Sequence, residues 1–274
     1  VTVLENQSIA RETYRIRIVC PEIARQVTPG QFLMLRLRSG DDPLLGRPFA
    51  LYDTVFDRDG RPEAVDLVYQ VVGRVTRRLA ALSVGDRLEV WGPLGNGFPP
   101  QDCQQLVMVA GGIGQTPFLA LAREHLHGRV YGHPPRRVPH VPSVVLCYGA
   151  RSGPYLAGVE DFERLGVDVR IRTDDGSSGE RGLVTESLQQ LLEEPPTGTR
   201  RIVCCGPEVM MAAVAELARR FDVPAQVSLE TPMACGIGIC FTCVASVRDS
   251  SGHSDYHRTC VEGPVFDAAR VDWA

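Results

Sequence analysis

The stretch Cys235-Gly236-Ile237-Gly238-Ile239-Cys240-Phe241-Thr242-Cys243 is followed by Cys260, so four cysteines lie near the C-terminus of this 274-residue chain. The C-x4-C-x2-C spacing with a distant fourth cysteine is typical of a plant-type [2Fe–2S] cluster, in which four thiolates hold two irons. Gly236 and Gly238 permit left-handed or crowded backbone, which lets a short loop wrap around a compact cluster. The pattern predicts a one-electron centre, and therefore electron transfer, with these metal ligands: Cys235, Cys240, Cys243 and Cys260.

Zinc and simple burial are the other interpretations of these cysteines. Structural zinc is usually held by separated C-x2-C pairs, which three sulfurs within one short loop fit poorly. Disulfides are not expected, because the total of nine cysteines is odd and we expect no signal segment before the first strand. Burial is expected for the cysteines in or beside apolar runs: Cys20, Cys103, Cys147, Cys204 and Cys205.

The composition narrows the class of protein. The hydrophobic content is 44% and the formal net charge is -4, which gives no reason to expect a nucleic-acid partner. No apolar stretch approaches the ~20 residues that a membrane-spanning helix needs. We therefore expect a cytoplasmic protein without a membrane span, long enough for two ordinary domains and a small appendage.

Short strands and turns dominate residues 1–100. The alternation of polar and apolar residues predicts strands at 15–19, 32–37, 65–71 and 88–91. Turn residues separate them, at Pro29-Gly30, 39–43, Asp59-Gly60 and Gly85-Asp86. Many short strands without a long helical period predict a small antiparallel β-barrel.

Residues 101–230 alternate between strands and helices. Strands are predicted at 106–110, 143–148, 167–171 and 201–205, and helices at 118–126, 159–165, 185–192 and 208–221. This alternation predicts an α/β domain with a parallel sheet covered by helices on both faces. The proline-rich segment 128–142 interrupts one helix-to-strand connection and predicts an irregular insertion on the surface.

Residues 231–274 hold the four cysteines and are too few for a sizeable core, so metal binding should supply much of their order. The fold class is therefore α+β with three domains. We expect a flavin-binding barrel at 1–100, a nucleotide-binding α/β domain at 101–230 and a small [2Fe–2S] domain at 231–274.

Two glycine-containing loops in the α/β domain are candidates for dinucleotide binding. Gly111-Gly112-Ile113-Gly114-Gln115-Thr116-Pro117 follows a strand and opens a helix, where backbone amides and the helix N-terminus favour a pyrophosphate. A tight turn is the alternative, but ligands in such sheets bind beyond the carboxyl ends of the strands. Cys205-Gly206-Pro207 ends another strand, and Gly206 would let a nicotinamide lie close to the backbone. The NAD(H) contacts expected here are Gly111, Gly112, Gly114, Thr116, Cys205, Gly206 and Pro207.

A third strand end, Thr173-Asp174-Asp175-Gly176-Ser177, could contact an adenosine ribose or be a plain turn. In the barrel, Arg47-Pro48-Phe49-Ala50-Leu51-Tyr52 offers a guanidinium suited to a phosphate. Phe49 and Tyr52 could cover an isoalloxazine ring, and Gly73-Arg74-Val75-Thr76 could hold a second phosphate. A purely structural arginine on an edge strand is the alternative.

Together with Gly-Pro-Leu-Gly-Asn-Gly-Phe at 92–98, these motifs resemble the ferredoxin reductase superfamily. More narrowly, the chain resembles the electron-transfer subunits of class 1B dihydroorotate dehydrogenase, most closely at Ser228-Leu229-Glu230 and at 260–266. The resemblance implies FAD and one [2Fe–2S] cluster. It places the FAD contacts at Arg47, Pro48, Phe49, Ala50, Val68, Tyr69, Gln70, Val75 and Thr76.

This chain departs from the family pattern at two of these positions. Ala50 stands where the family commonly has serine, which removes a hydroxyl partner for FAD. Val75 stands where the family usually has glycine, and its side chain could crowd the phosphate. The insertion at 128–142 is a third departure, and it could affect the choice of partner.

The function implied by the resemblance is electron exchange among NAD(H), FAD and the cluster. A flavin must lie between the other two, because NADH gives two electrons as hydride and a cluster accepts one at a time. The implied partner is an FMN-containing catalytic subunit that oxidises dihydroorotate to orotate in pyrimidine biosynthesis, in a heterotetramer. Two other hypotheses stay open: a reductase subunit of a hydrogenase, sulfur-reducing or bifurcating complex, and a zinc-stabilised binding protein without redox activity.

Overall fold

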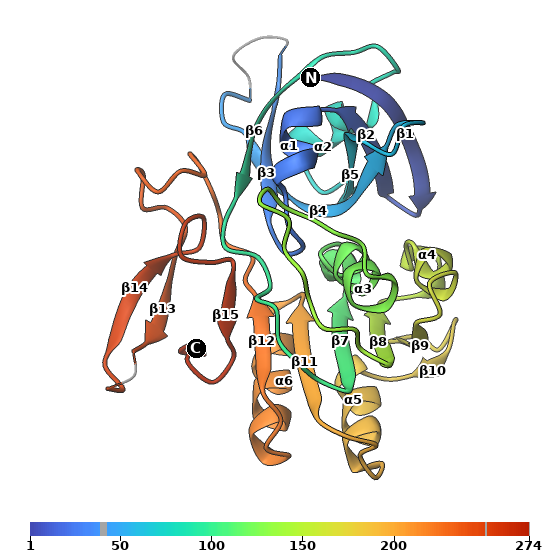
Figure 1. The fold of residues 1–274 in the computed structure, drawn as a ribbon, viewed down its shortest axis with the longest axis vertical. Coiled ribbons are helices and arrows are strands. Elements are labelled where there is room, and N and C mark those ends of the chain that lie inside the picture. Colours follow the sequence, from blue (N-terminus) through green and yellow to red (C-terminus); the bar gives the residue numbers. More distant parts are fainter. Residues whose placement is uncertain (39–42, 250, 274) are drawn as a thin grey trace.

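The computed structural model describes residues 1–38, 43–249 and 251–273. Figure 1 shows a β-barrel above a helix-flanked sheet, with the C-terminal segment, in red, beside both. Most of the turn predicted at 39–43 lies outside the described residues. No helix in the described ranges is long and apolar enough to span a membrane.

The N-terminal part is an antiparallel barrel, as predicted. Its strands follow the spatial order β1-β2-β5-β4-β3-β6, and a bridge between Thr2 and Arg87 brings β1 back to the β6 side. The elements are β1 (Thr2–Ala10), β2 (Thr13–Val19), α1 (Pro21–Gln26), β3 (Phe32–Leu37), β4 (Arg47–Phe56), β5 (Pro62–Gln70), α2 (Arg74–Ala80) and β6 (Leu88–Leu94). The sequence analysis missed β1, because its residues are mostly polar or half-buried and show no clear alternation.

The second part is a sheet whose strands β7 to β12 run parallel, as predicted, in the order β10-β9-β8-β7-β11-β12. Its strands are β7 (Gln105–Gly111), β8 (Ser143–Ala150), β9 (Asp168–Thr173), β10 (Glu180–Arg181), β11 (Arg200–Cys205) and β12 (Ala225–Ser228). Its helices are η1 (Gly112–Gln115), α3 (Phe118–His127), η2 (Gly153–Tyr155), α4 (Val159–Glu163), α5 (Val184–Glu193) and α6 (Glu208–Arg220).

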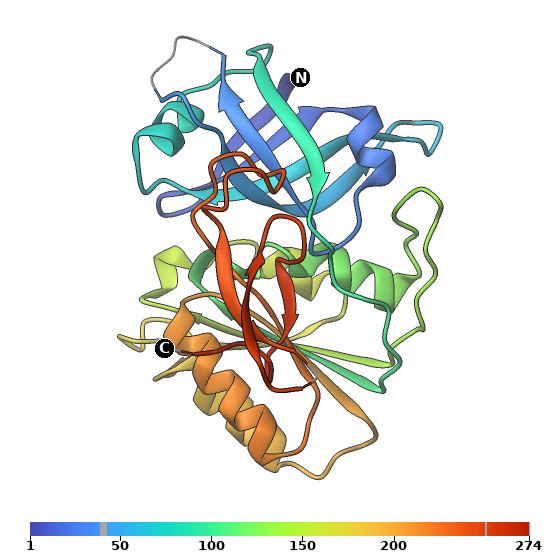
Figure 2. The same cartoon turned by 90° about the vertical axis from the view of Figure 1, so that its left-hand side faces the viewer.

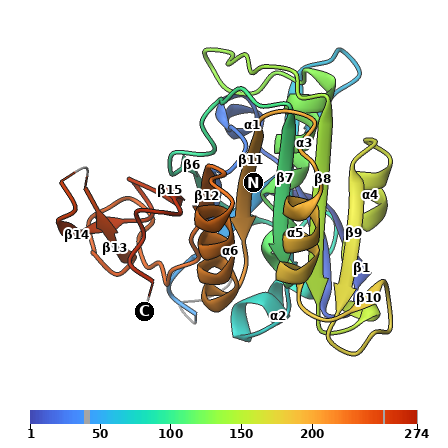
Figure 3. The same cartoon turned by 90° about the horizontal axis from the view of Figure 1, so that it is seen from below.

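Helices cover both faces of this sheet because alternate residues of each strand point to opposite faces. In β7, Leu106 and Met108 pack in the core that contains α3, whereas Val107 and Val109 pack with α5 and α6. Figure 3 shows α5 and α6 next to each other over one face. The helix α3 lies toward the barrel and contacts β4.

The C-terminal segment forms the hairpin β13 (Val244–Arg248) and β14 (Ser254–Arg258), followed by β15 (Val265–Asp267). The last strand pairs antiparallel with β12 and so extends the parallel sheet by one strand. Cys235, Cys240 and Cys243 lie between β12 and β13, and Cys260 lies just after β14. This segment is therefore tied to the nucleotide domain at its C-terminal end (Figure 1).

The insertion at 128–142 has no helix or named strand, as predicted, and rises from the sheet toward the barrel (Figure 2). The expectation that it lies on the surface is wrong for Tyr131 and Val141, which are buried. The reason is that Tyr131 donates a hydrogen bond from its hydroxyl to Asp53 Oδ1 at 2.8 Å. The insertion is therefore part of the contact between barrel and nucleotide domain.

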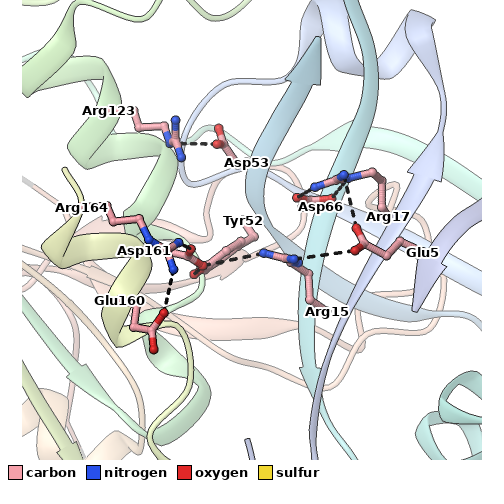
Figure 4. A network of polar contacts seen from close by, with 10 residues as sticks. All are labelled: Glu5, Arg15, Arg17, Tyr52, Asp53, Asp66, Arg123, Glu160, Asp161 and Arg164. Atoms are coloured by element: carbon pink, nitrogen blue, oxygen red, sulfur yellow. Dashed lines mark hydrogen bonds and ion pairs between the residues drawn. The ribbon is translucent and has the colours of Figure 1, made fainter. Parts of the chain in front are cut away.

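Charged residues continue this contact (Figure 4). Asp53 on β4 pairs with Arg123 of α3 at 2.9 Å and with Arg129 at 3.5 Å. Tyr52, the residue before Asp53 on β4, donates from its hydroxyl to Asp161 of α4 at 2.8 Å. The two domains are thus joined through groups with fixed hydrogen-bonding directions.

Candidate functional site

A first cavity of about 650 Å³ lies at the carboxyl ends of the parallel strands. Gly111 and Gly112 line it at the end of β7, and Gly206 and Pro207 line it after β11. Asp174 is the residue of the turn at 173–177 that faces it. Ligands of open α/β sheets bind at this edge, so the position suits a dinucleotide.

The two glycine-containing loops, predicted separately, pack directly against each other. A Cβ atom on Gly114 would lie 2.1 Å from the carbonyl oxygen of Cys205, a distance that real structures do not allow. Gly206 has a φ of +151° and would bring a Cβ within 3.0 Å of the Gly111 amide. Only glycine fits these contacts, and the tight packing leaves the outer backbone of both loops free to face a ligand.

A second cavity of about 600 Å³ lies between the three parts of the molecule. The nine residues to which the resemblance assigned FAD contacts all line it: Arg47, Pro48, Phe49, Ala50, Val68, Tyr69, Gln70, Val75 and Thr76. Thr231, Met233 and Pro264 line it from the cysteine-containing segment. One cavity therefore touches the barrel, the nucleotide domain and the region of the four cysteines.

Some sequence-predicted residues lie elsewhere than expected. Tyr52 is buried in the core with its hydroxyl on Asp161, so the prediction that it covers a flavin ring is wrong. Thr116 and Cys205 line the second cavity rather than the first, and Gly114 lines neither of them. Val75 packs into the barrel core while it also borders the second cavity.

The phosphate candidates of the barrel lie at the rim of the second cavity. Arg47 is exposed and donates from Nη1 to the carbonyl oxygens of Leu45 and Gly46, both at 3.0 Å. Thr76 Oγ1 accepts hydrogen bonds from the amides of Val72 and Gly73 at 3.0 Å each, which shapes the turn that enters α2. An anion could replace the two carbonyl acceptors at Arg47, because the guanidinium is a charged fork of donors.

The four cysteines come together as two pairs. The Cys235 side chain is the cysteine neighbour that influences the pKa of Cys240, and Cys243 is the cysteine neighbour that most influences the pKa of Cys260. Cys243 and Cys260 are buried, whereas Cys240 is exposed. Within the described ranges, no three His, Cys, Asp or Glu side chains are close enough to hold one metal ion. Two sulfur pairs fit two irons better than a single tetrahedral zinc.

Local hydrogen bonds prepare these sulfurs for metal binding. Thr242 donates from Oγ1 to Cys240 Sγ at 3.2 Å, and the amide of Ile237 donates to Cys235 Sγ at 3.4 Å. The Thr242 hydroxyl and backbone, followed by Cys235, lower the pKa of Cys240 to about 6. Burial, by contrast, raises the pKa of Cys260 to about 12. Cys240 therefore becomes a thiolate, the form that binds metal, at lower pH than Cys260 does.

The loop backbone turns through left-handed conformations at three positions: Gly236 (φ +74°), Gly238 (φ +80°) and Phe241 (φ +56°). A Cβ atom on Gly238 would lie 2.6 Å from Val261 Cγ2, so glycine is required there for space as well. The loop curls around the sulfurs as the glycines predicted, and its residues fit a [2Fe–2S] cluster.

The buried sulfur pair packs on the barrel. Cys243 and Cys260 form one apolar cluster with Phe32 and Met34 of β3, and Met233 packs against it. Trp91 of β6 donates from Nε1 to the carbonyl oxygen of Cys235 at 3.0 Å. Because Phe32 and Met233 also line the second cavity, that cavity adjoins the cluster that contains the buried cysteine pair.

Glu230 is a site residue to which the sequence analysis gave no role. It lines both cavities and accepts a hydrogen bond from the Cys205 thiol, with Oε1 3.8 Å from Sγ. Burial raises the pKa of its carboxyl above the usual value, although Cys205 opposes this. Its place two residues after the end of β12, at the carboxyl edge of the sheet, is the signal that could have identified it.

Three family models match consecutive parts of the chain. An oxidoreductase FAD-binding domain matches residues 1–98, an oxidoreductase NAD-binding domain matches 108–216, and the iron-sulfur cluster binding domain of dihydroorotate dehydrogenase B matches 230–272. Each match falls on the part of the structure that contains the corresponding cavity wall or cysteine pairs. The residues between the models include the connection from β6 to β7 and the strand β12.

Whole-chain comparisons agree with these matches. The electron transfer subunit of dihydroorotate dehydrogenase B (NAD(+)) from Desulforamulus reducens is 34% identical over 99% of this chain and 97% of its own length. The same subunit from Caldanaerobacter subterraneus is 35% identical over 98% of this chain and 96% of its own.

Among solved structures, a chain of the NADH-dependent reduced ferredoxin-NADP oxidoreductase, studied for flavin-based electron bifurcation, has a TM-score of 0.80. It is 28% identical, and the match covers 99% of this chain and 89% of that one. Phthalate dioxygenase reductase shares the fold at a TM-score of 0.61 and 20% identity, over 94% of this chain and 76% of its own. From its sequence relatives, its three matched domains and its fold, this chain belongs to the family of dihydroorotate dehydrogenase B electron transfer subunits.

Proposed function

We propose that this chain passes electrons between NAD(H) and a separate catalytic subunit that oxidises dihydroorotate to orotate in pyrimidine biosynthesis. The observation that carries the proposal is the position of the second cavity. Its walls come from the barrel, from the nucleotide domain and from the segment next to the paired cysteines. A flavin there would adjoin both the dinucleotide cavity and the buried sulfur pair.

The chemistry itself belongs to the bound groups. FAD exchanges hydride with NAD(H) and single electrons with a [2Fe–2S] cluster. The protein holds these groups in fixed positions and keeps water out. We propose that Cys235, Cys240, Cys243 and Cys260 hold the cluster. The nine cavity residues of the barrel would hold FAD, and the dinucleotide would contact Gly111, Gly112, Gly206 and Pro207. Gly114 would instead pack the two glycine loops together, and Thr116 and Cys205 would face the flavin side.

Glu230 supplies the proton site that this chemistry needs. Converting a hydride into single electrons releases or takes up a proton, which requires an acceptor beside the reacting ring. Glu230 lies in the wall shared by both cavities, and its carboxylate is accessible there, so it can accept or return a proton beside the bound groups. The Cys205 thiol, whose pKa burial raises well above its usual value, stays protonated beside it.

The partner that we propose is an FMN-containing catalytic subunit, which binds where the cluster approaches the surface, in a cytoplasmic heterotetramer. Around the exposed Cys240, the side chains of Ile237, Ile239, Phe241 and Val261 are exposed, Ile239 to 74%. Apolar side chains gathered in one place on a surface mark interaction sites. A subunit that covers them would also bring its own flavin close to the cluster.

A second candidate function is supported by the likeness to the bifurcating oxidoreductase chain. In this alternative, the same three domains serve a reductase subunit of a bifurcating complex. The two candidates differ in the partner and agree on the cofactors. Purification from the native cells would separate them, because only the main proposal requires co-purification with an FMN protein that oxidises dihydroorotate.

The central experiment replaces Cys240 with alanine. We expect Cys240→Ala to lose the iron and the visible absorbance of the cluster and to stop electron delivery to the partner. NADH-to-dye activity, which needs only FAD, should survive in part. Cys103→Ala, at a buried cysteine outside both cavities, is the matched control and should keep the cluster. Unchanged partner reduction by Cys240→Ala, or a wild-type protein that contains zinc and is colourless, would contradict the proposal.

A further inference from the structure

Arg258, the last residue of β14, holds the cysteine loop on both sides of Cys240. Its Nη1 donates to the carbonyl oxygen of Gly238 at 3.2 Å. Its guanidinium carbon lies 5.2 Å from the centre of the Phe241 ring, a cation–π contact. Gly238 lies two residues before Cys240, and Phe241 lies directly after it.

Gly238 and Phe241, the two residues that Arg258 contacts, both have a left-handed backbone conformation. Gly238 has a φ of +80° and Phe241 a φ of +56°. A left-handed conformation is costly for a large residue such as phenylalanine, so the surroundings must stabilise it. The guanidinium over the Phe241 ring is a contact that does so, which makes the shape of the loop depend on Arg258.

The same residue also lies close to the buried sulfur pair, because Arg258 stands two residues before Cys260 in the chain. Its guanidinium reaches across to the carbonyl oxygen of Gly238, so its charge lies between the Cys240 loop and the segment that carries Cys260. Charge and hydrogen bonding around the sulfurs are among the means by which proteins tune the potential of an iron–sulfur cluster.

Glu262 holds Arg258 in turn. One carboxylate oxygen of Glu262 accepts from Arg258 Nε at 3.3 Å and from the Arg258 amide at 2.8 Å. The other accepts from His257 Nδ1 at 3.0 Å. The positive charge of Arg258 thus lies next to the cysteine loop and is partly balanced by one adjacent negative charge.

We propose that Arg258 is a positioning residue for the cluster, which fixes the Cys240 loop and, with Glu262 as its counter-charge, sets the reduction potential. The inference rests on the proposed function, since it requires a bound [2Fe–2S] cluster. Reduction adds one negative charge to the cluster. A nearby cation therefore favours the reduced form, and a nearby carboxylate disfavours it.

The test measures the midpoint potential of the cluster in purified holoprotein, by a redox titration followed with electron paramagnetic resonance. Arg258→Gln should shift the potential downward, because it removes the cation. Glu262→Gln should shift it upward, because it removes the counter-charge and keeps an oxygen acceptor. Arg258→Lys should largely restore the potential, since the charge remains. Arg248→Gln removes a charge at the far end of the β13–β14 hairpin and should leave the potential unchanged.

A second measurement, the rate at which the cluster is lost to a chelator, tests whether Arg258 positions the loop. In Arg258→Gln, and to a smaller extent in Arg258→Lys, the cluster should be lost faster to a ferrous-iron chelator than in the wild type, because the planar fork over Phe241 is gone. Shifts of Arg258→Gln and Glu262→Gln in the same direction, or no shift in either, would overturn this inference alone. A wild-type protein with no cluster signal would instead overturn the proposed function.

Discussion

The barrel meets its two neighbours through contacts of different character. Toward the nucleotide domain it buries charge, with Asp53 facing Arg129, Tyr131 and Arg123, of which Figure 4 shows Arg123. Toward the cysteine-containing segment the contact at the buried cysteine pair is apolar, with Phe32 and Met34 packed on it, and hydrogen bonds such as that of Trp91 lie at its edge. The polar contact constrains how the barrel and the nucleotide domain are oriented relative to each other. The apolar contact keeps the buried cysteine pair close to the barrel.

The free energies of the two contacts should differ accordingly. Burial raises the pKa of Asp53 even though Arg123, Arg129 and Tyr131 act against the rise, so its ionised form gains little net stability in the fold. Buried ion pairs often only balance the cost of removing their charges from water. Packed apolar side chains lose contacts and leave a cavity when they are shortened. The apolar contact should therefore be the more sensitive to mutation.

Met34→Ala should have the largest effect. Met34 is fully buried, and a Cβ atom on Gly236 would lie 2.6 Å from its Cγ, so it supports the cysteine loop directly. We expect a loss of about 2–5 kcal/mol in unfolding free energy, measured by urea unfolding, together with faster loss of iron. Met211→Ala, at a buried residue of α6, is the matched control and should lower stability without faster iron loss. Equal iron retention in both variants would refute the assigned role of the apolar contact.

Asp53→Asn should have a smaller effect, of about 1 kcal/mol, because the half-exposed Arg123 and Arg129 can turn to water and Tyr131 can still donate to the amide oxygen. Urea unfolding measures this difference as well. Asp59→Asn, at an exposed aspartate of the β4–β5 turn, should change stability by less than about 0.5 kcal/mol. A loss at Asp53 as large as that of Met34→Ala would show that the polar contact dominates.

The smallest predicted effect is a pH dependence. Because the folded-state pKa of Asp53 is raised, the folded protein binds its proton more tightly than the unfolded chain does. The stability gained from this proton is fully present below the ordinary aspartate pKa of about 3.9. It is lost as the pH rises through the raised folded value. Over that window, unfolding free energies should fall with pH more steeply in the wild type than in Asp53→Asn. Parallel pH profiles would contradict the assigned shift.

Much of the architecture could be predicted from the sequence. Alternating and buried runs predicted the antiparallel barrel and the parallel sheet, and the resemblance assigned nine barrel residues that all line one cavity. Tyr52 was misassigned because alternation along a strand does not tell which side of the barrel meets the neighbouring domain. No role was predicted for Glu230, because it stands out only as a residue that lines both cavities. The other walls of these cavities come from segments far from Glu230 in the sequence.

The chemistry of the cysteine loop was determined by the sequence itself. Three proposed ligands and two glycines lie within nine residues, from Cys235 to Cys243, so local backbone geometry and thiolate chemistry suffice to predict a metal site there. Only the tertiary structure decided which sulfur pair faces the barrel, that Phe32 and Met233 join its surroundings to the second cavity, and that Arg258 holds the loop. These contacts join residues from distant strands, and their geometry depends on how whole domains pack, which local sequence patterns do not encode.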